Sequence, residues 1–184
     1  MQIANSPRLQ FEMITYRDAD LLFELDQDPQ VMRYINGGTP STMSDITEKF
    51  IPRVEVFTNV EKGWGLWKVT TLASEDPRPA QFIGWILVRP MDFFSDQPNC
   101  HDIEIGWRFK RCSWGKGYAT EAAHAVADAI AAQPEVTHLS AIADDANFGS
   151  INIMKKLGMD FIKVDTYDVH GRDVDVVCYQ KRVK

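Results

Sequence analysis

Residues 108–122 read Arg-Phe-Lys-Arg-Cys-Ser-Trp-Gly-Lys-Gly-Tyr-Ala-Thr-Glu-Ala, and this stretch says most about the fold. The extended apolar run Ile-Glu-Ile-Gly-Trp at 103–107 precedes it, and an alanine-rich helical pattern follows it. Gly115 and Gly117 therefore lie at the turn between an expected strand and an expected helix. The first N–H groups of a helix have no partner within the helix, and the helix dipole adds positive potential there. The stretch thus predicts a binding site for a phosphate or pyrophosphate.

Two known glycine motifs fit this turn poorly. A P-loop requires Ser or Thr after its Gly-Lys pair, whereas Lys116 is followed by Gly117. The dinucleotide fingerprint requires a third glycine or an alanine at position 120, where this chain has Thr120. Its strand should also run almost directly into the first glycine, but polar residues occupy 110–113. A nucleotide-binding protein of another class is therefore the weakest functional alternative.

Two segments resemble the GNAT N-acetyltransferase family. Trp-Gly-Lys-Gly-Tyr-Ala-Thr-Glu-Ala at 114–122, after Glu-Ile-Gly-Trp at 104–107, is similar to the family's acetyl-CoA loop, and most of all to the ribosomal-protein N-terminal acetyltransferases. Gly115 and Gly117 match the glycines of the pattern Gln/Arg-x-x-Gly-x-Gly/Ala, whereas Cys112 stands at its first position. The segment 146–161 is similar to the family's Asn-x-x-Ser helix, which ends in Lys-Leu-Gly-Phe. The resemblance extends from about Arg8 to Tyr179.

Composition indicates an ordinary globular protein. The chain has 184 residues, of which 45% are hydrophobic and 25% charged, and we expect one domain over 1–184 with its core at 8–182. We find no apolar run of membrane-spanning length and no signal-peptide core, so we expect a cytoplasmic protein. The net charge of −6 argues against nucleic acid as the main partner. The three cysteines and four histidines lack the spacing of a disulfide framework or a metal site, and we expect no metal.

The apolar pattern predicts an α/β fold, a mixed sheet with helices on both faces. Strands are expected at 9–13, 63–71, 81–88, 101–109, 137–143, 161–169 and 174–179. Helices are expected at 18–26, from Pro29 to Ile35, from a cap at Ser41 or Ser44 toward Phe57 with Pro52 kinking or dividing it, along the stripe of Tyr118, Ala122, Val126 and Ile130, and at 147–157 before Gly158. Turns are expected at 74–79 and at His170-Gly171. The resemblance implies the same order, with a mostly antiparallel sheet of about seven strands.

The resemblance also implies where the cofactor binds. The strand before the glycine loop and the strand before the Asn-x-x-Ser helix splay apart in the family, and the pantetheine arm pairs with the backbone of the first strand. The amides of 114–119 would hold the pyrophosphate. The side chains of Arg111 and Lys116 could reach the phosphates, but for each of them a solvated surface charge without a binding role is an equal alternative. The expected cofactor residues are Trp107, Arg108, Phe109, Arg111, Trp114, Gly115, Lys116, Gly117, Tyr118, Ala119, Asn147 and Ser150.

The chemistry implied is direct attack of an amine on the thioester of acetyl-CoA. An alkylammonium must first lose a proton, and Glu104 on the strand beside the cofactor is the candidate base; the alternative is a structural glutamate bonded to a neighbouring backbone group or to an arginine. Many family members have a tyrosine acid seven residues after the helix asparagine, but this chain has Met154 there. Ser150 or water would then protonate the thiolate. Tyr34, Phe93 and Phe94 lie in segments that line the acceptor site in relatives.

These observations leave the acceptor open. The first hypothesis is an N-acetyltransferase that acts on a protein N-terminus or on a small-molecule amine. Because dimers are frequent in the family, the resemblance also implies a homodimer. The second is a non-catalytic acyl-CoA-binding or regulatory module of the same fold, which the missing tyrosine favours. Fold resemblance alone cannot choose between acceptors.

Overall fold

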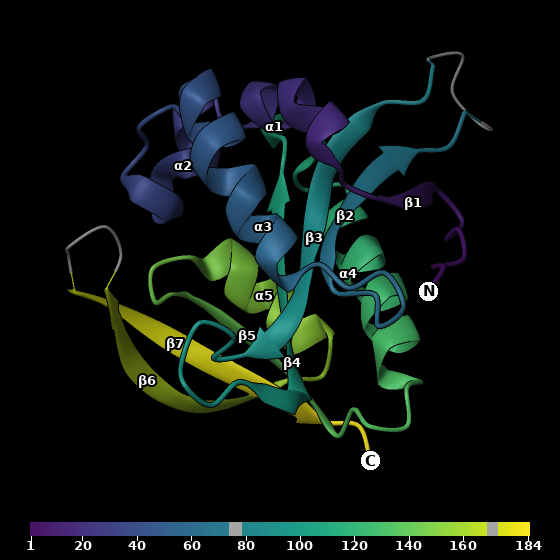
Figure 1. Cartoon of the computed structure of the whole chain (residues 1–184), viewed down its shortest axis with the longest axis vertical. Coiled ribbons are helices and arrows are strands. Elements are labelled where there is room, and N and C mark those ends of the chain that lie inside the picture. Colours follow the sequence, from purple (N-terminus) through teal and green to yellow (C-terminus); the bar gives the residue numbers. More distant parts are fainter. Residues whose placement is uncertain (74–78, 169–172) are drawn as a thin grey trace.

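A seven-stranded open sheet forms the centre of the computed structural model, which describes residues 1–73, 79–168 and 173–184, without the side chains of Tyr167 and Asp168 (Figure 1). The expected turns at 74–79 and His170-Gly171 lie largely or wholly outside the described residues. The strands are β1 (Leu9–Met13), β2 (Gly65–Thr71), β3 (Phe82–Met91), β4 (Asn99–Phe109), β5 (His138–Asp144), β6 (Asp160–Asp168) and β7 (Asp173–Arg182).

The sheet is mixed but mostly antiparallel, as expected. Its order is β1-β2-β3-β4-β5-β7-β6, and β4 with β5 forms the parallel pair. The first four strands follow one another as antiparallel neighbours, because each connection returns the chain beside the strand it has just left. The helices are η1 (Tyr16–Asp18), α1 (Ala19–Leu25), α2 (Pro29–Asn36), η2 (Asp45–Phe50), α3 (Ile51–Phe57), η3 (Arg111–Ser113), α4 (Tyr118–Ala131) and α5 (Phe148–Lys156).

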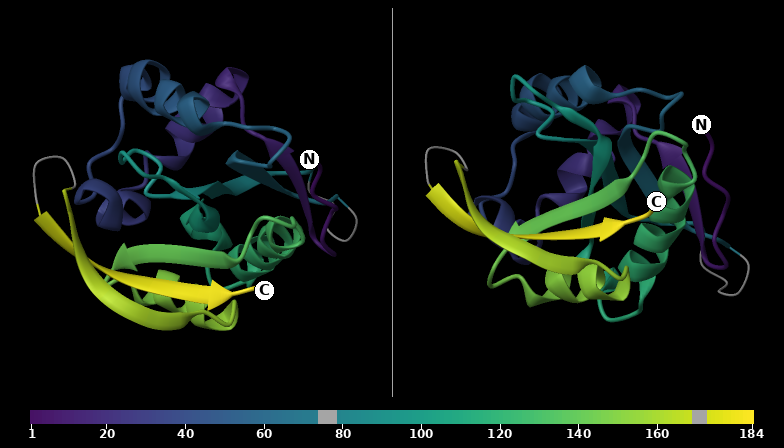
Figure 2. Two further views of the ribbon diagram at one scale, coloured as in Figure 1. Left: turned by 60° about the horizontal axis from the view of Figure 1, so that its bottom comes forward. Right: turned by 90° about the horizontal axis from the view of Figure 1, so that it is seen from below.

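Helices cover both faces of the sheet (Figure 2). The segment from α1 to α3 packs on one face through a buried apolar cluster that includes Leu22, Val54 and Trp85. Helices α4 and α5 pack on the other face through a larger cluster. The predicted stripe of α4 belongs to this second cluster, since Ala122, Val126 and Ile130 are fully buried. Among the described residues no helix has the length and apolarity needed to cross a membrane.

The prediction for the start of the third helical segment was wrong. Neither Ser41 nor Ser44 caps it: Ser44 makes no capping hydrogen bond, and the Ser41 hydroxyl donates to Asp26 at 2.8 Å. Thr42 and Asp45 instead form a reciprocal pair, in which the Asp45 backbone N–H donates to Oγ1 of Thr42 at 3.0 Å and the Thr42 N–H donates to the Asp45 carboxylate at 3.0 Å. Both polar residue types cap well, so the sequence alone did not distinguish them.

Strands β4 and β5 part soon after they meet. Only three residue pairs join them, and the last is Glu104 with Ser140. Beyond this point β4 continues along β3 to Phe109, while β5 continues along β7 to Asp144. The backbone of β4 from Ile105 onward therefore has no strand partner on the β5 side. This gap matches the splay that the resemblance implied, and it opens toward the start of α4.

Candidate functional site

The glycine loop presents free backbone donors at the start of α4. The N–H groups of residues 115–119 donate to no backbone acceptor in the described part of the chain, whereas the N–H of Trp114 is already bonded to the Arg111 carbonyl at 3.1 Å. Gly115 and Gly117 have φ of +72° and +80°, a region that favours glycine. An added Cβ would have nothing within 4 Å at Gly115 and only a guanidinium nitrogen of Arg8, at 3.4 Å, at Gly117. A ligand can therefore approach this backbone closely.

Arg8 fixes the loop from outside. Its Nε donates to Oε2 of Glu121 at 2.6 Å, its Nη1 donates to the Lys116 carbonyl at 3.0 Å, and its guanidinium lies 4.4 Å from the ring centroid of Tyr118. Burial of Glu121 opposes its ionisation, but hydrogen bonds from Ser6 and Arg8 outweigh burial and lower the pKa of Glu121. The Lys116 carbonyl is thus occupied by Arg8, which leaves the neighbouring amides to face a ligand.

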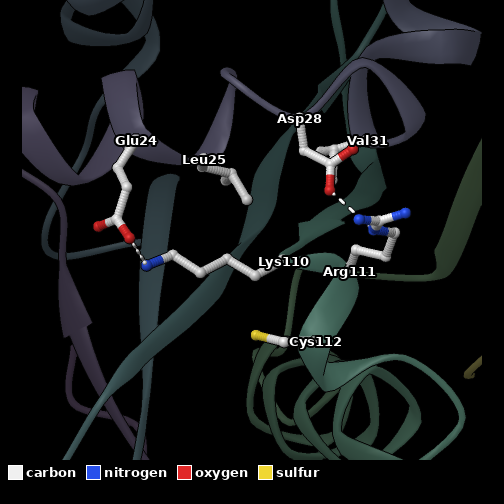
Figure 3. Close-up of a pocket in the computed structure, with 7 residues that line it drawn as sticks. All are labelled: Glu24, Leu25, Asp28, Val31, Lys110, Arg111 and Cys112. Atoms are coloured by element: carbon white, nitrogen blue, oxygen red, sulfur yellow. Dashed lines mark ion pairs between the residues drawn. The ribbon is translucent and has the colours of Figure 1, made fainter.

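The basic residues around the loop differ in how they are paired (Figure 3). Arg111 donates to Asp28 at 2.9 Å, and Lys110 pairs with Glu24 at 2.8 Å. These pairs lie at a pocket of about 380 Å³ between the α1–α2 connection and the start of η3, with Cys112 in its wall. Arg111 is 63% exposed, so solvent screens its ion pair with Asp28 and the pair adds little to stability. Lys116 is exposed and forms no ion pair with any described residue.

Asn147 and Ser150 lie across the gap from β4. Asn147 caps α5, since its Oδ1 accepts the N–H of Ser150 at 3.1 Å, and its amide nitrogen donates to no described residue. The indole Nε1 of Trp107 donates to Oγ of Ser150 at 3.1 Å. This bond joins β4 to α5 across the gap between β4 and β5. It leaves the hydroxyl proton of Ser150 without an acceptor among the described residues.

Glu104 lies where β4 and β5 part, and it is buried. Its Oε2 accepts a hydrogen bond from Nε of Arg89 at 2.6 Å, and the Arg89 side chain is 21% exposed. Oε1 accepts no hydrogen bond from a described residue, and it is not among the buried polar atoms sealed from solvent. One oxygen is therefore held by Arg89, and the other is available to a proton donor.

A second buried carboxylate lies two residues before Glu104. Ser140 on β5 donates to Asp102 at 2.8 Å, and the side-chain amide of Gln180 on β7 donates to the same carboxylate at 2.8 Å. Burial raises the pKa of Asp102 even though both hydrogen bonds work against the rise. This network ties β4, β5 and β7 together at the base of the gap.

Arg108 points to the face covered by α1–α3. Its Nη1 donates to Asp26 at 2.6 Å, and its guanidinium lies 5.0 Å from the ring centroid of Trp85. Nε of Arg108 and Nε1 of Trp85 are buried without hydrogen-bond partners. The side chain of Arg108 thus supports α1, so that only its backbone lies on the open edge of β4.

The expected acceptor residues separate into two groups. Phe93 and Phe94, which follow β3, pack edge-on with ring centroids 5.2 Å apart, and Phe57 of α3 lies 5.8 Å from Phe93. Arg89 lies 5.6 Å from the Phe94 ring and joins this group to Glu104. Tyr34 lies on α2, where Arg33 stacks over its ring at 5.2 Å, and no contact among the described residues links it to Glu104.

Met154 is fully buried within the apolar cluster under α5. A thioether carries no proton to donate, and this one lies in the core. No group of three or more His, Cys, Asp or Glu within the described residues could hold a metal ion.

Sequence reasoning missed the residues that support the site from other elements. Arg8 and Arg89 lie far along the chain from the glycine loop, and Asp102, two residues before Glu104, belongs to no motif. The register of the β3–β4 hairpin places Arg89 opposite Glu104. The strand register was the signal that could have revealed this pair. Predicting the register would have required the exact length of the loop between β3 and β4.

Comparison with known proteins gives the chain its relatives. A family model described as an acetyltransferase (GNAT) domain matches residues 8–160. The uncharacterised protein YkkB of Bacillus subtilis (strain 168) is 33% identical over 159 residues, which cover 85% of this chain and 84% of the relative. The uncharacterised N-acetyltransferase YnaD of the same organism is 28% identical over 152 residues, which cover 83% and 79%.

Solved structures share the fold. An acetyltransferase (GNAT family) from Bacillus anthracis has a TM-score of 0.75 at 23% identity and covers 100% of this chain and 99% of its own. RimL, a ribosomal-protein alpha-N-acetyltransferase in complex with coenzyme A, has a TM-score of 0.75 at 10% identity and covers 99% and 98%. The aminoglycoside acetyltransferase AAC(6′)-Ib in complex with coenzyme A and kanamycin has a TM-score of 0.72 at 15% identity and covers 95% and 94%.

Proposed function

The chain belongs to the GNAT acetyltransferase family, and we propose that it transfers an acetyl group from acetyl-CoA to a primary amine by direct attack. The acceptor is either a protein N-terminus or a small-molecule amine. Relatives named for a ribosomal protein and for an aminoglycoside both have this fold, so the fold does not choose between them.

The row of free amides at residues 115–119 carries the proposal. Backbone donors that converge at a helix N-terminus bind phosphate groups, and the two glycines leave the approach open. The edge of β4 from Ile105 onward has no strand partner, and apart from the Phe109 carbonyl, which accepts from Nε1 of Trp114, it offers the backbone groups that an amide-bearing arm needs. Asn147 offers its amide nitrogen from the opposite side of the gap. These residues fit a coenzyme A derivative, which when bound supplies a thioester as the acetyl donor.

The chain's own residues and water share the proton transfers of this proposal. The free oxygen of Glu104 accepts the proton that the acceptor ammonium must lose before its nitrogen can form the new C–N bond. As the C–S bond breaks, the hydroxyl of Ser150 donates a hydrogen bond to the leaving thiolate, which takes its proton from water, and the second proton of the attacking nitrogen returns to water. The indole N–H of Trp107 donates into Oγ of Ser150 and so strengthens the Ser150 hydroxyl as a hydrogen-bond donor.

Calorimetry with a matched pair of glycine variants tests the cofactor assignment. Gly117 and Gly158 both have left-handed backbone, with φ of +80° and +75°, so that Ala costs about 1 kcal/mol of strain at either position. We expect Gly117→Ala to weaken acetyl-CoA binding, and Gly158→Ala, outside the loop, to leave it unchanged. ATP and NAD serve as ligand controls. The assignment would be contradicted by equal affinities of the native protein and the two variants for acetyl-CoA. It would also be contradicted if the folded native protein did not bind acetyl-CoA.

A non-catalytic acyl-CoA-binding module is the second candidate. It is favoured by the buried Met154 at the usual acid position and by the ion pair that holds Glu104. Glu104→Gln separates the two candidates. For an enzyme we expect a loss of roughly 100-fold in kcat with an unchanged Kd for acetyl-CoA, because general base catalysis is lost while the loop is untouched. Native protein that binds acetyl-CoA but acetylates no amine in a panel, with the variant no different, would support the module.

A further inference from the structure

A cluster of two arginines and three aromatic rings lies beside Glu104. Arg89, on β3, bonds Glu104 at 2.6 Å and lies 5.6 Å from the Phe94 ring centroid. Arg53, on α3, stacks over the same ring at 3.7 Å. Phe57 and Phe93 pack edge-on around Phe94, which joins α3 to the segment that follows β3. Helix α3 lies against the sheet beside β3, on the face that Trp85 also occupies (Figure 1).

The cluster has more positive than negative charge. Glu104 is the carboxylate within ion-pair distance of Arg89, and no carboxylate of a described residue lies within that distance of Arg53. Partial desolvation, and then the charge of Arg89, lower the pKa of Arg53. Two guanidinium groups that share one ring repel each other, and an anion between them removes that cost. The chain as a whole carries a net charge of −6, so this local excess is not a general property of its surface.

The position of the cluster connects it with the reaction. Glu104 forms the last pair before β4 and β5 part, and Arg89 touches its carboxylate directly. An amine that gives its proton to Glu104 would therefore lie close to Arg89, and an acceptor group that follows the Arg89 side chain would reach Phe94 and Arg53. A guanidinium binds a carboxylate through a planar, forked pair of N–H groups, and the Phe94 ring under Arg53 holds that plane.

We propose that the acceptor carries a carboxylate near its amine and that Arg53, supported by Arg89 and Phe94, binds it. The acceptor class is therefore a small amino carboxylate and not a polyamine or another polycation. This inference rests on the proposed function, because it assumes that an amine is acetylated at Glu104. It assigns Arg53 a role in acceptor specificity that is separate from proton transfer.

Matched acceptors test the proposal. Glycylglycine and glycylglycinamide share an α-amine of similar basicity and differ in the carboxylate. We expect kcat/KM to be about tenfold higher for glycylglycine, as a charge-assisted hydrogen bond provides. Arg53→Gln should remove about this tenfold ratio, and Phe94→Leu should reduce it by removing the ring under Arg53. Arg17→Gln, at an exposed arginine that stacks on Tyr16, should keep the ratio.

Equal kcat/KM for the two acceptors in the native enzyme would overturn the proposal. A ratio that stays the same in Arg53→Gln would also overturn it, since the preference would then come from another group. Arg89→Gln is not used alone, because it also releases Glu104.

A binding arm keeps this result apart from a failure of the proposed function. N-acetylglycylglycine, which carries the carboxylate but no reactive amine, is titrated into the protein with CoA present. If acetyl-CoA binds but neither dipeptide is acetylated, the proposed function fails, and the titration alone tests the carboxylate site at Arg53. Saturable binding that Arg53→Gln weakens about tenfold supports the carboxylate site, and no binding, or equal binding by the variant, overturns it.

Discussion

Replacement of Arg8 tests how the glycine loop is held. The Arg8 guanidinium bonds the Lys116 carbonyl at 3.0 Å and Glu121 at 2.6 Å, but it belongs to neither the loop nor α4. We expect Arg8→Gln to release the Lys116 carbonyl, which can then turn toward the phosphates and oppose the neighbouring amides. The variant should therefore bind acetyl-CoA more weakly without any loss of a direct cofactor contact.

The magnitude follows from the contacts and their exposure. A hydrogen bond that involves a charged group contributes about 1.5–3 kcal/mol when it is shielded from water. The Arg8 side chain is 43% exposed, so solvent screening reduces this value, and we take about 1 kcal/mol for the Lys116 contact. That corresponds to roughly a fivefold increase in the Kd for acetyl-CoA.

A truncated donor separates positioning of the loop from general damage. S-acetylpantetheine has the thioester but lacks the pyrophosphate, so its use should not depend on Arg8. We expect Arg8→Gln to raise the Kd for acetyl-CoA, measured by calorimetry, and to leave kcat/KM with S-acetylpantetheine unchanged. Arg17→Gln controls for loss of an exposed arginine. The reasoning is refuted if the variant loses both donors equally or if its affinity for acetyl-CoA is that of the native protein.

Two further predictions concern buried groups. Burial raises the pKa of Asp102 in the folded protein above its unfolded value of about 4. The contribution of Asp102 to stability is therefore complete below the unfolded pKa and is lost as pH rises through the folded pKa. Urea unfolding should thus show the stability of the native protein relative to Asp102→Asn falling over that window, and a constant difference would contradict the burial argument. Met154→Ala should cost about 2–5 kcal/mol of unfolding free energy and Met154→Leu less than about 1.5 kcal/mol, since Met154 is fully buried. Unchanged amine acetylation in the folded Leu variant would agree with a packing role, and its loss would show a chemical one.

The sequence predicted the elements that local pattern determines. The strand-loop-helix at 103–131 has an apolar run, two glycines and a stripe with a period near four, and each of these is a local signal. The family resemblance added the mostly antiparallel character of the sheet and the gap between β4 and β5, which no local signal contains.

The parts that could not be predicted depend on distant contacts. The cap at Thr42 was missed because neighbouring residues 41, 42 and 44 are all of types that cap helices. The pairing of Arg89 with Glu104 depends on strand register, and the contact of Arg8 with Lys116 joins residues more than 100 positions apart. The expected base was placed at the gap, but its arginine partner appeared only in three dimensions.

The short junction between β4 and β5 also bears on how the molecule opens. Strands β1–β4 form one set of antiparallel neighbours and β5–β7 another, and three residue pairs join the two sets. Hydrogen exchange should therefore report two cooperative units, and those amides of β4 beyond Glu104 that point into the gap, away from β3, should be among the first to exchange. A ligand that bonds to both sides of the gap adds its binding free energy to the junction between the units. Binding of a ligand in the gap would therefore stabilise the junction between the two sets of strands, and the sheet would be least rigid when no acetyl donor is bound.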